Sequence, residues 1–117
     1  MLNLGHKQLD TWKISLDLVT TIYALTQNFQ PSETYNLSNQ LRRAAVSIPS
    51  NIAEGAARNS PADRRRFYEI ARSSLVEIDT QLEIAIRLHY LIREDLTGLA
   101  EQCNHLFAAL SRLMERT

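Results

Sequence analysis

Residues 37–58 read LSNQLRRAAVSIPSNIAEGAAR, a stretch whose apolar and polar side chains fall on separate arcs of a helix. At about 100° per residue, one arc about 100° wide is apolar and is expected to face a core. It holds Leu37, Leu41, Ala44, Ala45, Ile48 and Ile52. A polar arc of similar width holds Arg43, Ser47, Ser50, Asn51, Glu54 and Arg58. The pattern predicts an amphipathic helix over residues 33–57, with Glu33 near its positive end. Pro49 lies inside, and its missing N–H predicts a kink there or two shorter helices that meet at Ile48.

Three further helices are predicted on either side of this stretch. Residues 9–29 form the first, and Pro31 ends it. Residues 61–90 form the third, with Ser60 as N-cap, Pro61 at the first helical position and Asp63 in the first turn. Residues 94–116 form the fourth, whose apolar positions alternate steps of three and four as in a bundle seam. Short links favour antiparallel neighbours, so the expected fold is all-α: one antiparallel up-and-down four-helix bundle, a single domain over residues 1–117.

The apolar faces of the first and third helices are wider than a four-helix core requires. The first helix has one stripe of Trp12, Leu16, Val19, Tyr23 and Thr26, and a second of Leu18, Ile22, Leu25 and Phe29. The third helix centres on Phe67, Ala71, Ser74, Ile78, Leu82 and Ala85, and it is widened by Ile70, Leu75, Ile86 and Leu88. This surplus favours self-association. The alternative is that the broad faces wrap around a kinked second helix.

The composition is that of an ordinary globular chain. Hydrophobic residues make up 44% and charged residues 22%, which argues against disorder, and three glycines and three prolines are too few for a many-stranded β fold. The single cysteine, Cys103, excludes an internal disulfide, and residues 1–7 lack the apolar core of a signal peptide. No run approaches the roughly 20 apolar residues of a membrane span. A cytoplasmic chain without membrane contact is therefore expected.

Charge is distributed unevenly along the chain, although the formal net charge is zero. Seven arginines and three acids lie between residues 42 and 72, and the arginines are Arg42, Arg43, Arg58, Arg64, Arg65, Arg66 and Arg72. Guanidinium groups bind phosphate through two parallel hydrogen bonds, so these residues are candidates for nucleic-acid binding. Arg42 and Arg43 on the second helix, and Arg64 to Arg66 at the start of the third, are both expected to border the turn near residues 58–60, if a kink brings the end of the second helix close to it.

The alternative is an ordinary solvated surface, in which Arg65 and Arg72 pair with Glu69, and Arg43 or Arg58 pairs with Glu54. On the outer side of the third helix, Glu83 and Arg87 form a further predicted pair. Aromatic side chains that could stack on bases are not expected at the surface. Those considered fall in predicted core stripes: Trp12, Tyr23, Phe67 and Phe107.

The polar arc of the second helix is not expected to be catalytic. Ser47 and Glu54 share that arc, but no histidine lies within two turns on the helix, and no glycine-rich turn exposes the serine. The structural interpretation is that Asn51 and Ser47 satisfy carbonyl oxygens freed by Pro49, while Glu54 pairs with an arginine in the same or a neighbouring subunit.

A metal or cofactor site is not expected either. His6, His89 and His105 are scattered, and Cys103 and His105 point to different faces of one helix. Cys103 occupies a core position and is predicted to pack as a small hydrophobic residue. No small-molecule substrate is implied.

The run from Gln40 to Gly55, QLRRAAVSIPSNIAEG, closely resembles the signature of a bacterial protein family. That family comprises small four-helix-bundle proteins first described as encoded by intervening sequences within 23S ribosomal RNA genes, and it is also labelled S23. Weaker matches cover the first and third helices: Leu9, Trp12, Phe29, Asp63, Arg66, Phe67, Ile70, Ala71, Glu77, Gln81, Leu82, Ala85, Leu88, His89, Tyr90 and Leu91.

The resemblance implies a four-helix bundle that assembles as a homopentamer and has no established enzymatic activity. A distant relative with this architecture, the accessory protein of diversity-generating retroelements, binds RNA and a reverse transcriptase through a basic surface; that parallel is an analogy between folds. The expected function is a non-enzymatic homo-oligomer that binds RNA or a nucleoprotein through an arginine-rich surface. The alternative is a protein–protein scaffold, or the product of a mobile insertion, without nucleic-acid binding.

Overall fold

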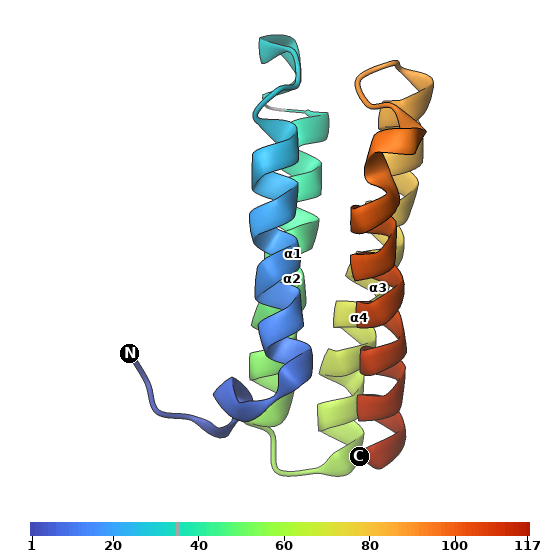
Figure 1. Cartoon of the computed structure of the whole chain (residues 1–117). Coiled ribbons are helices and arrows are strands. Elements are labelled where there is room, and N and C mark those ends of the chain that lie inside the picture. Colours follow the sequence, from blue (N-terminus) through green and yellow to red (C-terminus); the bar gives the residue numbers. More distant parts are fainter. Residues whose placement is uncertain (35) are drawn as a thin grey trace.

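Four antiparallel helices build the molecule. The computed structural model describes residues 1–34 and 36–117. The α-helices are α1 (Asp10–Thr26), α2 (Leu37–Ala56), α3 (Pro61–Arg87) and α4 (Thr97–Arg116), and the short 3-10 helices are η1 (Gly5–Gln8), η2 (Pro31–Glu33) and η3 (Arg93–Leu96). Figure 1 shows α1 and α2 as one pair and α3 and α4 as the other, with each helix antiparallel to the next. No strand occurs among the described residues, and the predicted all-α four-helix fold is confirmed.

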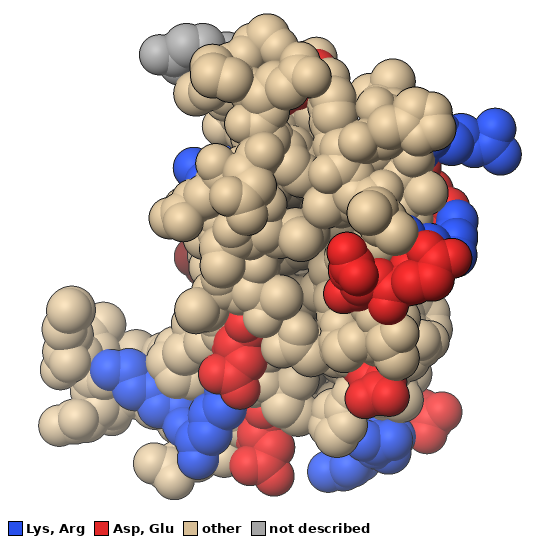
Figure 2. Space-filling view, turned by 45° about the horizontal axis from the view of Figure 1, so that its top comes forward, with Lys and Arg blue, Asp and Glu red and all other residues tan. Residues whose placement is uncertain are grey.

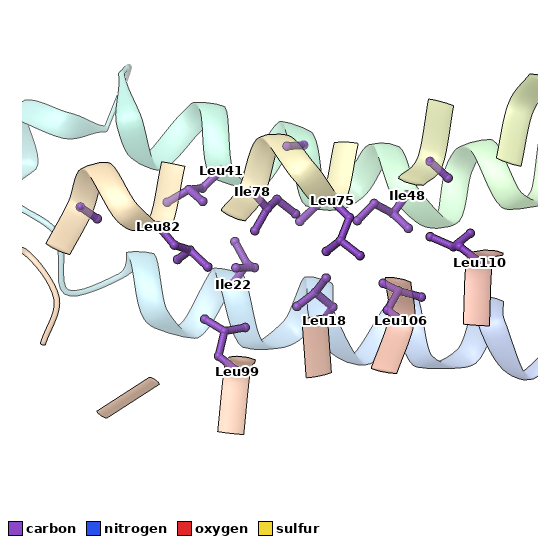
Figure 3. Close-up of a cluster of buried hydrophobic side chains, with 14 of the residues drawn as sticks. Leu18, Ile22, Leu41, Ile48, Leu75, Ile78, Leu82, Leu99, Leu106 and Leu110 are labelled. Atoms are coloured by element: carbon purple, nitrogen blue, oxygen red, sulfur yellow. The ribbon is translucent and has the colours of Figure 1, made fainter. Parts of the chain in front are cut away.

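The core lies along the axis between the two pairs. Figure 3 shows buried side chains from all four helices pointing toward one another: Leu18, Ile22, Leu41, Ile48, Leu75, Ile78, Leu82, Leu99, Leu106 and Leu110. All six members of the apolar arc predicted for the second helix are buried. Each fully buried leucine or isoleucine contributes about 1.5–3 kcal/mol relative to an exposed one, so this arc fixes the rotation of α2.

Proline does not divide the second helix. α2 runs without interruption from Leu37 to Ala56 with Pro49 inside it, so the alternative of two helices that meet at Ile48 is wrong, while the kink stays a prediction. Two side chains bind carbonyl oxygens beside the proline. Ser50 Oγ donates to the Val46 carbonyl at 2.9 Å, and Asn51 Nδ2 donates to the Ser47 carbonyl at 2.8 Å. The carbonyl that loses its N–H partner to the proline is that of Ala45, four residues earlier, so these bonds reinforce the neighbouring carbonyls rather than replace the missing bond.

The first two helices are shorter than predicted. α1 ends at Thr26, where the Thr26 hydroxyl turns back and donates to the Ile22 carbonyl at 2.8 Å. α2 begins at Leu37, because Glu33 lies before it in η2 and its Oε2 accepts the Leu37 N–H at 3.0 Å. Tyr35, which belongs to the predicted helix over residues 33–57, lies outside the described residues.

The start of α3 follows the prediction, and its end does not. Ser60 Oγ accepts the Asp63 N–H at 3.1 Å, with Pro61 at the first helical position, so the predicted N-cap is confirmed. α3 ends at Arg87 rather than residue 90, because His89 turns the chain with a left-handed φ of 64°. α4 then begins at Thr97, after η3, instead of at residue 94.

The predicted surplus of apolar surface is present. On α1 the buried stripe contains Leu18 and Ile22, whereas Leu16 and Tyr23 of the neighbouring stripe are 39% and 40% exposed. On α3 the buried side chains are Tyr68, Ala71, Leu75, Ile78, Gln81, Leu82 and Ala85. The exposed large apolar side chains of α3 are Ile70, Val76 and Ile84, and Leu88 follows at its end. No helix in residues 1–34 or 36–117 combines the length and the apolar character needed to cross a membrane.

Candidate functional site

One edge of the polar arc of α2 faces α3 through Ser47, while Arg43, Ser50 and Glu54 of the same arc are exposed. The hydroxyl oxygens of Ser47 and Ser74 lie 3.0 Å apart across the two helices, and Asn51 Nδ2 donates to Ser47 Oγ at 3.0 Å. Ser47 therefore bonds across the helix interface, and Ser50 rather than Ser47 joins Asn51 in binding backbone carbonyls. This arrangement supports the structural interpretation of the arc, since both hydroxyls and the amide have partners within the fold.

Of the predicted arginine–carboxylate pairs, one forms among the described residues. Arg58 Nη2 lies 3.1 Å from Glu54 Oε2, with both side chains about half exposed, so the pair contributes only about 0–1 kcal/mol. The predicted partner of Arg65 and Arg72, Glu69, forms no ion pair in the part of the chain that the structure describes. Glu83 binds Arg93 through two hydrogen bonds of 2.9 and 2.5 Å instead of pairing with Arg87.

Arg64 closes the turn between α2 and α3. Its Nη1 donates to the carbonyl oxygens of Arg58 and Asn59, at 3.1 and 3.0 Å. These carbonyls follow the C-terminal end of α2, where the helix dipole is negative and a cation is favourable. Arg64 therefore stabilises the turn through these hydrogen bonds, and this explains the presence of a cation near the positive N-terminal end of α3.

Arg42 lies far from this turn, contrary to the expectation for the whole arginine set. It is about 21 Å from Ala56 along α2, at about 1.5 Å per residue. Its Nε donates to Thr26 Oγ1 at 2.8 Å, and its guanidinium lies 4.6 Å from the centroid of the Tyr23 ring. Arg43, the next residue, is exposed at the same distant level. The seven arginines therefore do not form one patch.

Arg72 is also occupied within the bundle. Its Nη1 donates to Ser111 Oγ of α4 at 3.0 Å, and its guanidinium lies 5.4 Å from the centroid of Phe107. This contact fixes the relative level of the antiparallel helices α3 and α4. Arg65, seven residues before Arg72, therefore lies just beyond the level at which α4 ends with Arg116.

The fold gathers cations at the end of the bundle where α2 leads into α3. We call this region the basic end and define it as Arg58, Arg64, Arg65, Arg66, Arg112 and Arg116. Figure 1 shows that the start of α3 and the end of α4 lie together at that end. Sequence reasoning missed Arg112 and Arg116 because they lie at least 40 residues after the predicted cluster, which ends at Arg72. The antiparallel order of the predicted helices was the signal that could have placed them.

Acidic side chains are interleaved with the cations. Figure 2 shows Lys and Arg at the lower left and lower right and again at the upper right, with Asp and Glu among them. Arg65 and Arg66 are nevertheless exposed, and the described residues contain no ion pair for either. Arg58 and Arg66 both lie over the ring of Phe67, at 4.7 and 4.9 Å from its centroid. These guanidinium groups are oriented by the ring and remain accessible from solvent.

The expectation that aromatic rings are absent from the surface is wrong. Tyr23 is 40% and Phe107 is 41% exposed, and each carries an arginine over its face. Both rings lie outside the buried core cluster, so part of each ring meets solvent.

A groove between α3 and α4 has a volume of about 590 Å³. Apolar side chains dominate its lining, including Val76, Ile86, Leu96, Cys103 and Phe107, and Asp79, Glu83 and Arg93 are its charged residues. Burial, and secondly the Asp79 carboxylate, raises the pKa of the Cys103 thiol from 9.0 to about 11. Hydrogen bonding to Arg93 lowers the pKa of Glu83. Cys103 thus remains a protonated thiol at neutral pH, as a small packing residue would.

Two further hollows lie elsewhere on the bundle. One, of about 430 Å³, lies between α1 and α2 and is lined by Val19, Thr20, Tyr23, Ala24, Gln27 and Val46. The other, of about 550 Å³, lies between α1 and α4 and mixes cations with Asp10 and Asp17. None of the three hollows is lined by Ser47, Asn51 or Glu54. Within residues 1–34 and 36–117, no three His, Cys, Asp or Glu side chains are grouped so as to hold a metal ion.

Known proteins that are similar to this chain agree with the four-helix fold and with the family resemblance. No protein of curated function matches the chain. Among solved structures, a protein of unknown function from the S23 ribosomal protein family of Bacteroides thetaiotaomicron superposes with a TM-score of 0.81. It is 24% identical, and the match covers 90% of this chain and 95% of that chain, which establishes a shared fold. The family model described as 23S rRNA-intervening sequence protein matches residues 7–112. The chain therefore belongs to the family of 23S rRNA-intervening sequence proteins, a family of unknown function.

Proposed function

We propose that the chain is a non-enzymatic homo-oligomer, a pentamer as the family resemblance implies, that binds RNA through its basic end. The observation that carries the proposal is the position of Arg65 and Arg66. Both are exposed near the N-terminal end of α3, and no carboxylate among the described residues pairs with either. A helix N-terminus disfavours nearby cations, so cations kept there without an internal partner favour an external anion.

The neighbouring residues suit a phosphate backbone. The guanidinium groups of Arg58 and Arg66 both lie over the ring of Phe67. Because the ring already restricts these side chains, each loses less conformational entropy when it binds a phosphate. Arg112 and Arg116 of α4 add cations in the hollow between α1 and α4, which Asp10 and Asp17 also line. The interleaved carboxylates keep the field of a single subunit weak, so repetition of the basic end in an oligomer is the source of affinity. Backbone contacts of this kind carry little sequence information.

Self-association is supported by apolar surface that one subunit leaves exposed. Val46, Ile70, Val76, Ile84 and Phe107 are between 41% and 52% exposed, and they occupy three of the four helices. Exposed apolar area of this extent favours contact between copies.

The test is a titration of single-stranded RNA with the purified chain at several salt concentrations. Phosphate contacts release counterions, so the logarithm of the association constant should fall linearly with the logarithm of salt concentration. The triple variant Arg65→Gln, Arg66→Gln and Arg116→Gln should reduce that slope by about 0.7 for each phosphate group that the variant no longer binds. These three positions are chosen because Arg42, Arg64 and Arg72 hold the fold together, and their replacement would confound the result.

The matched control is Arg87→Gln, an exposed arginine at the opposite end of α3. It should leave both affinity and salt slope unchanged. If the native chain shows no RNA affinity at low salt, or if Arg87→Gln weakens binding as much as the triple variant, the proposal is wrong.

The second candidate is a protein–protein scaffold without nucleic-acid contact. It is favoured by the apolar α3–α4 groove, which offers few groups suited to nucleic acid. A specific protein partner that co-purifies and survives nuclease treatment would support it.

A further inference from the structure

The hollow between α1 and α4 is lined by side chains of both charge signs that do not pair with one another. Its charged residues are Asp10, Lys13 and Asp17 of α1, and Arg112 and Arg116 of α4. Asp10 and Asp17 lie three and four residues from Lys13, spacings at which ion pairs form readily along a helix. In the part of the chain that the structure describes, no ion pair joins any of these five side chains. Their charges are therefore available to a ligand.

Thr11 lines the same hollow and is only 8% exposed. Within residues 1–34 and 36–117 its hydroxyl makes no hydrogen bond, whereas Thr20, Thr21 and Thr26 of the same helix each donate to a carbonyl one turn earlier. Among the described residues, Gln81 Oε1 is the one side-chain nitrogen or oxygen that is both enclosed and unpartnered, so the Thr11 hydroxyl is reached from the hollow. Because buried polar groups usually have a partner, this hydroxyl calls for one from outside the chain.

The N-terminal end of α1 lies beside this hydroxyl and is not capped. Leu9 is the N-cap residue and offers no side-chain acceptor, and the N–H groups of Asp10 and Thr11 have no acceptor among the described residues. Figure 1 shows α1 beginning and α4 ending toward the same end of the bundle, which brings Arg112 and Arg116 to these donors. Uncapped N–H groups, a hydroxyl and guanidinium groups together suit a phosphate, although the Asp10 carboxylate opposes it.

The hollow changes character along α1. Ile14 follows Thr11 by one turn and is half-buried, and Ala109 and Leu113 of α4 line the hollow with it. Asp17 lies one turn further, about 9 Å from Thr11 along the helix axis. Donors for an anion are thus followed by apolar side chains and then by a carboxylate.

We propose that this hollow binds a small phosphate monoester that carries an ammonium group at the end of a short alkyl chain. The phosphate accepts hydrogen bonds from the Thr11 hydroxyl and the N-terminal N–H groups of α1, beside Arg112 and Arg116. The alkyl chain packs on Ile14, and the ammonium group lies at Asp17. This site is separate from the binding of RNA and from self-association, and it depends on neither.

The charges of site and ligand match. With His105 neutral, the three cations of the hollow exceed its two carboxylates by one. A phosphate monoester carries a charge of about −2 above its second pKa of about 6, and the ammonium group reduces this by one. The ligand therefore neutralises the excess charge of the hollow, which a phosphate without an amine would overcompensate.

Calorimetric titration of the native chain with aminobutyl phosphate, at low salt and about pH 8, tests the proposal. Butyl phosphate lacks the ammonium group, and aminobutanol lacks the phosphate. Aminobutyl phosphate should bind about 2- to 5-fold more tightly than butyl phosphate, which is the effect of one exposed ion pair. Aminobutanol should bind most weakly of the three, because it makes none of the contacts at the N-terminal end of α1.

Two variants assign the contacts, and a third is the matched control. Thr11→Val replaces the hydroxyl by a methyl group of similar size and should weaken both phosphate compounds by at least about 10-fold. Asp17→Asn should reduce the affinity for aminobutyl phosphate to that for butyl phosphate and leave butyl phosphate unaffected. Thr20→Val makes the same replacement on an exposed part of α1 outside this hollow and should change neither affinity. Circular dichroism verifies the helical fold of each variant.

Several results would overturn the site. These are a native chain that does not bind aminobutyl phosphate, equal affinity for aminobutyl and butyl phosphate, or an effect of Thr20→Val as large as that of Thr11→Val. If Thr11→Val fails to fold, the exposed Asp17→Asn variant decides alone. Absence of RNA binding in a chain that binds aminobutyl phosphate would refute the proposed function and leave this site standing, and the reverse result would overturn this site alone.

Discussion

Gly55 of α2 lies directly against the ring of Tyr68 of α3. A Cβ added at Gly55 would stand 2.8 Å from Tyr68 Cε1 and 3.0 Å from the Cβ of Phe67. Tyr68 is only 3% exposed, and its burial raises the pKa of its hydroxyl. Glycine is required here because two helices approach each other more closely than any side chain permits. The backbones of α2 and α3 are thereby held together next to the basic end.

Gly55→Ala should therefore destabilise the chain. The new methyl group meets a buried ring and a neighbouring Cβ that is fixed to the backbone, and such overpacking costs about 1–3 kcal/mol. The higher helix propensity of alanine returns at most about 1 kcal/mol. Urea denaturation followed by circular dichroism measures the difference. Gly98→Ala is the matched control, since no atom lies within 4 Å of its added Cβ, and it should be neutral or stabilising. Equal effects at the two glycines would contradict the close approach.

Adjacent arginines on α2 should differ sharply in their contribution to stability. Arg42 donates to Thr26 Oγ1 and covers the Tyr23 ring, so Arg42→Gln should reduce the free energy of unfolding by about 1–2 kcal/mol. Arg43 is exposed, and Arg43→Gln should change it by less than about 0.5 kcal/mol. Thermal unfolding of both variants under one buffer condition provides the comparison. A larger loss of stability at Arg43 would show that the contact between Arg42 and α1 does not form in solution.

The sequence predicted those features of the fold that depend on neighbouring residues along one helix. Helical periodicity identified six of the nine buried positions of α2, and cap chemistry identified the contact of Ser60 with Asp63. Both signals are local, because they depend on residues within one or two turns. Periodicity could not decide which of two adjacent apolar stripes of α1 faces the core. Leu18 and Leu16 differ by two positions and are 0% and 39% exposed, a choice that depends on how the neighbouring helices are placed.

The arginines show the same limit for the candidate site. Nearness in sequence grouped Arg42 with Arg64, but the chain places Arg42 against α1 and Arg64 on the turn after α2. Conversely, Arg116 joins the basic end only through the antiparallel return of α4. The count of charges along the sequence therefore predicted a basic cluster, but it did not predict which arginines lie together in the fold.

Cys103 should react slowly with alkylating reagents at neutral pH. Burial raises its pKa to about 11 from 9.0, and reaction requires the thiolate, so at pH 8 the folded chain should react roughly 100-fold more slowly than the unfolded chain. The rate of iodoacetamide labelling, followed by mass spectrometry with and without denaturant, checks this. Labelling of the folded chain at the rate of the unfolded one would contradict the raised pKa of this partly buried thiol.

The same thiol affects stability at high pH. Because the folded chain holds the Cys103 proton more tightly than the unfolded chain, its stabilising effect is complete below pH 9 and is lost as pH rises from 9.0 toward about 11. Cys103→Ala should remove this part of the pH dependence, so native and variant curves should converge as pH rises across that interval. Parallel curves would assign the alkaline loss of stability to other groups.

His89→Gly should stabilise the fold. His89 follows the C-terminal end of α3 with a φ of 64°, and the chain closes there through hydrogen bonds from His89 N to Ile86 O and from Tyr90 N to Ala85 O. This is the pattern of a helix terminated by a left-handed residue, a position at which glycine escapes the clash between Cβ and the backbone. Relief of that clash is worth about 1–2 kcal/mol, and the greater freedom of glycine in the unfolded chain removes part of the gain, so a net increase in the free energy of unfolding of about 0.5–1 kcal/mol is expected.

His89→Ala is the control. It retains the Cβ and should show no increase, which separates the backbone effect from removal of the exposed imidazole. Urea denaturation of the three chains decides the matter: if alanine stabilises as much as glycine, the left-handed turn is not the cause.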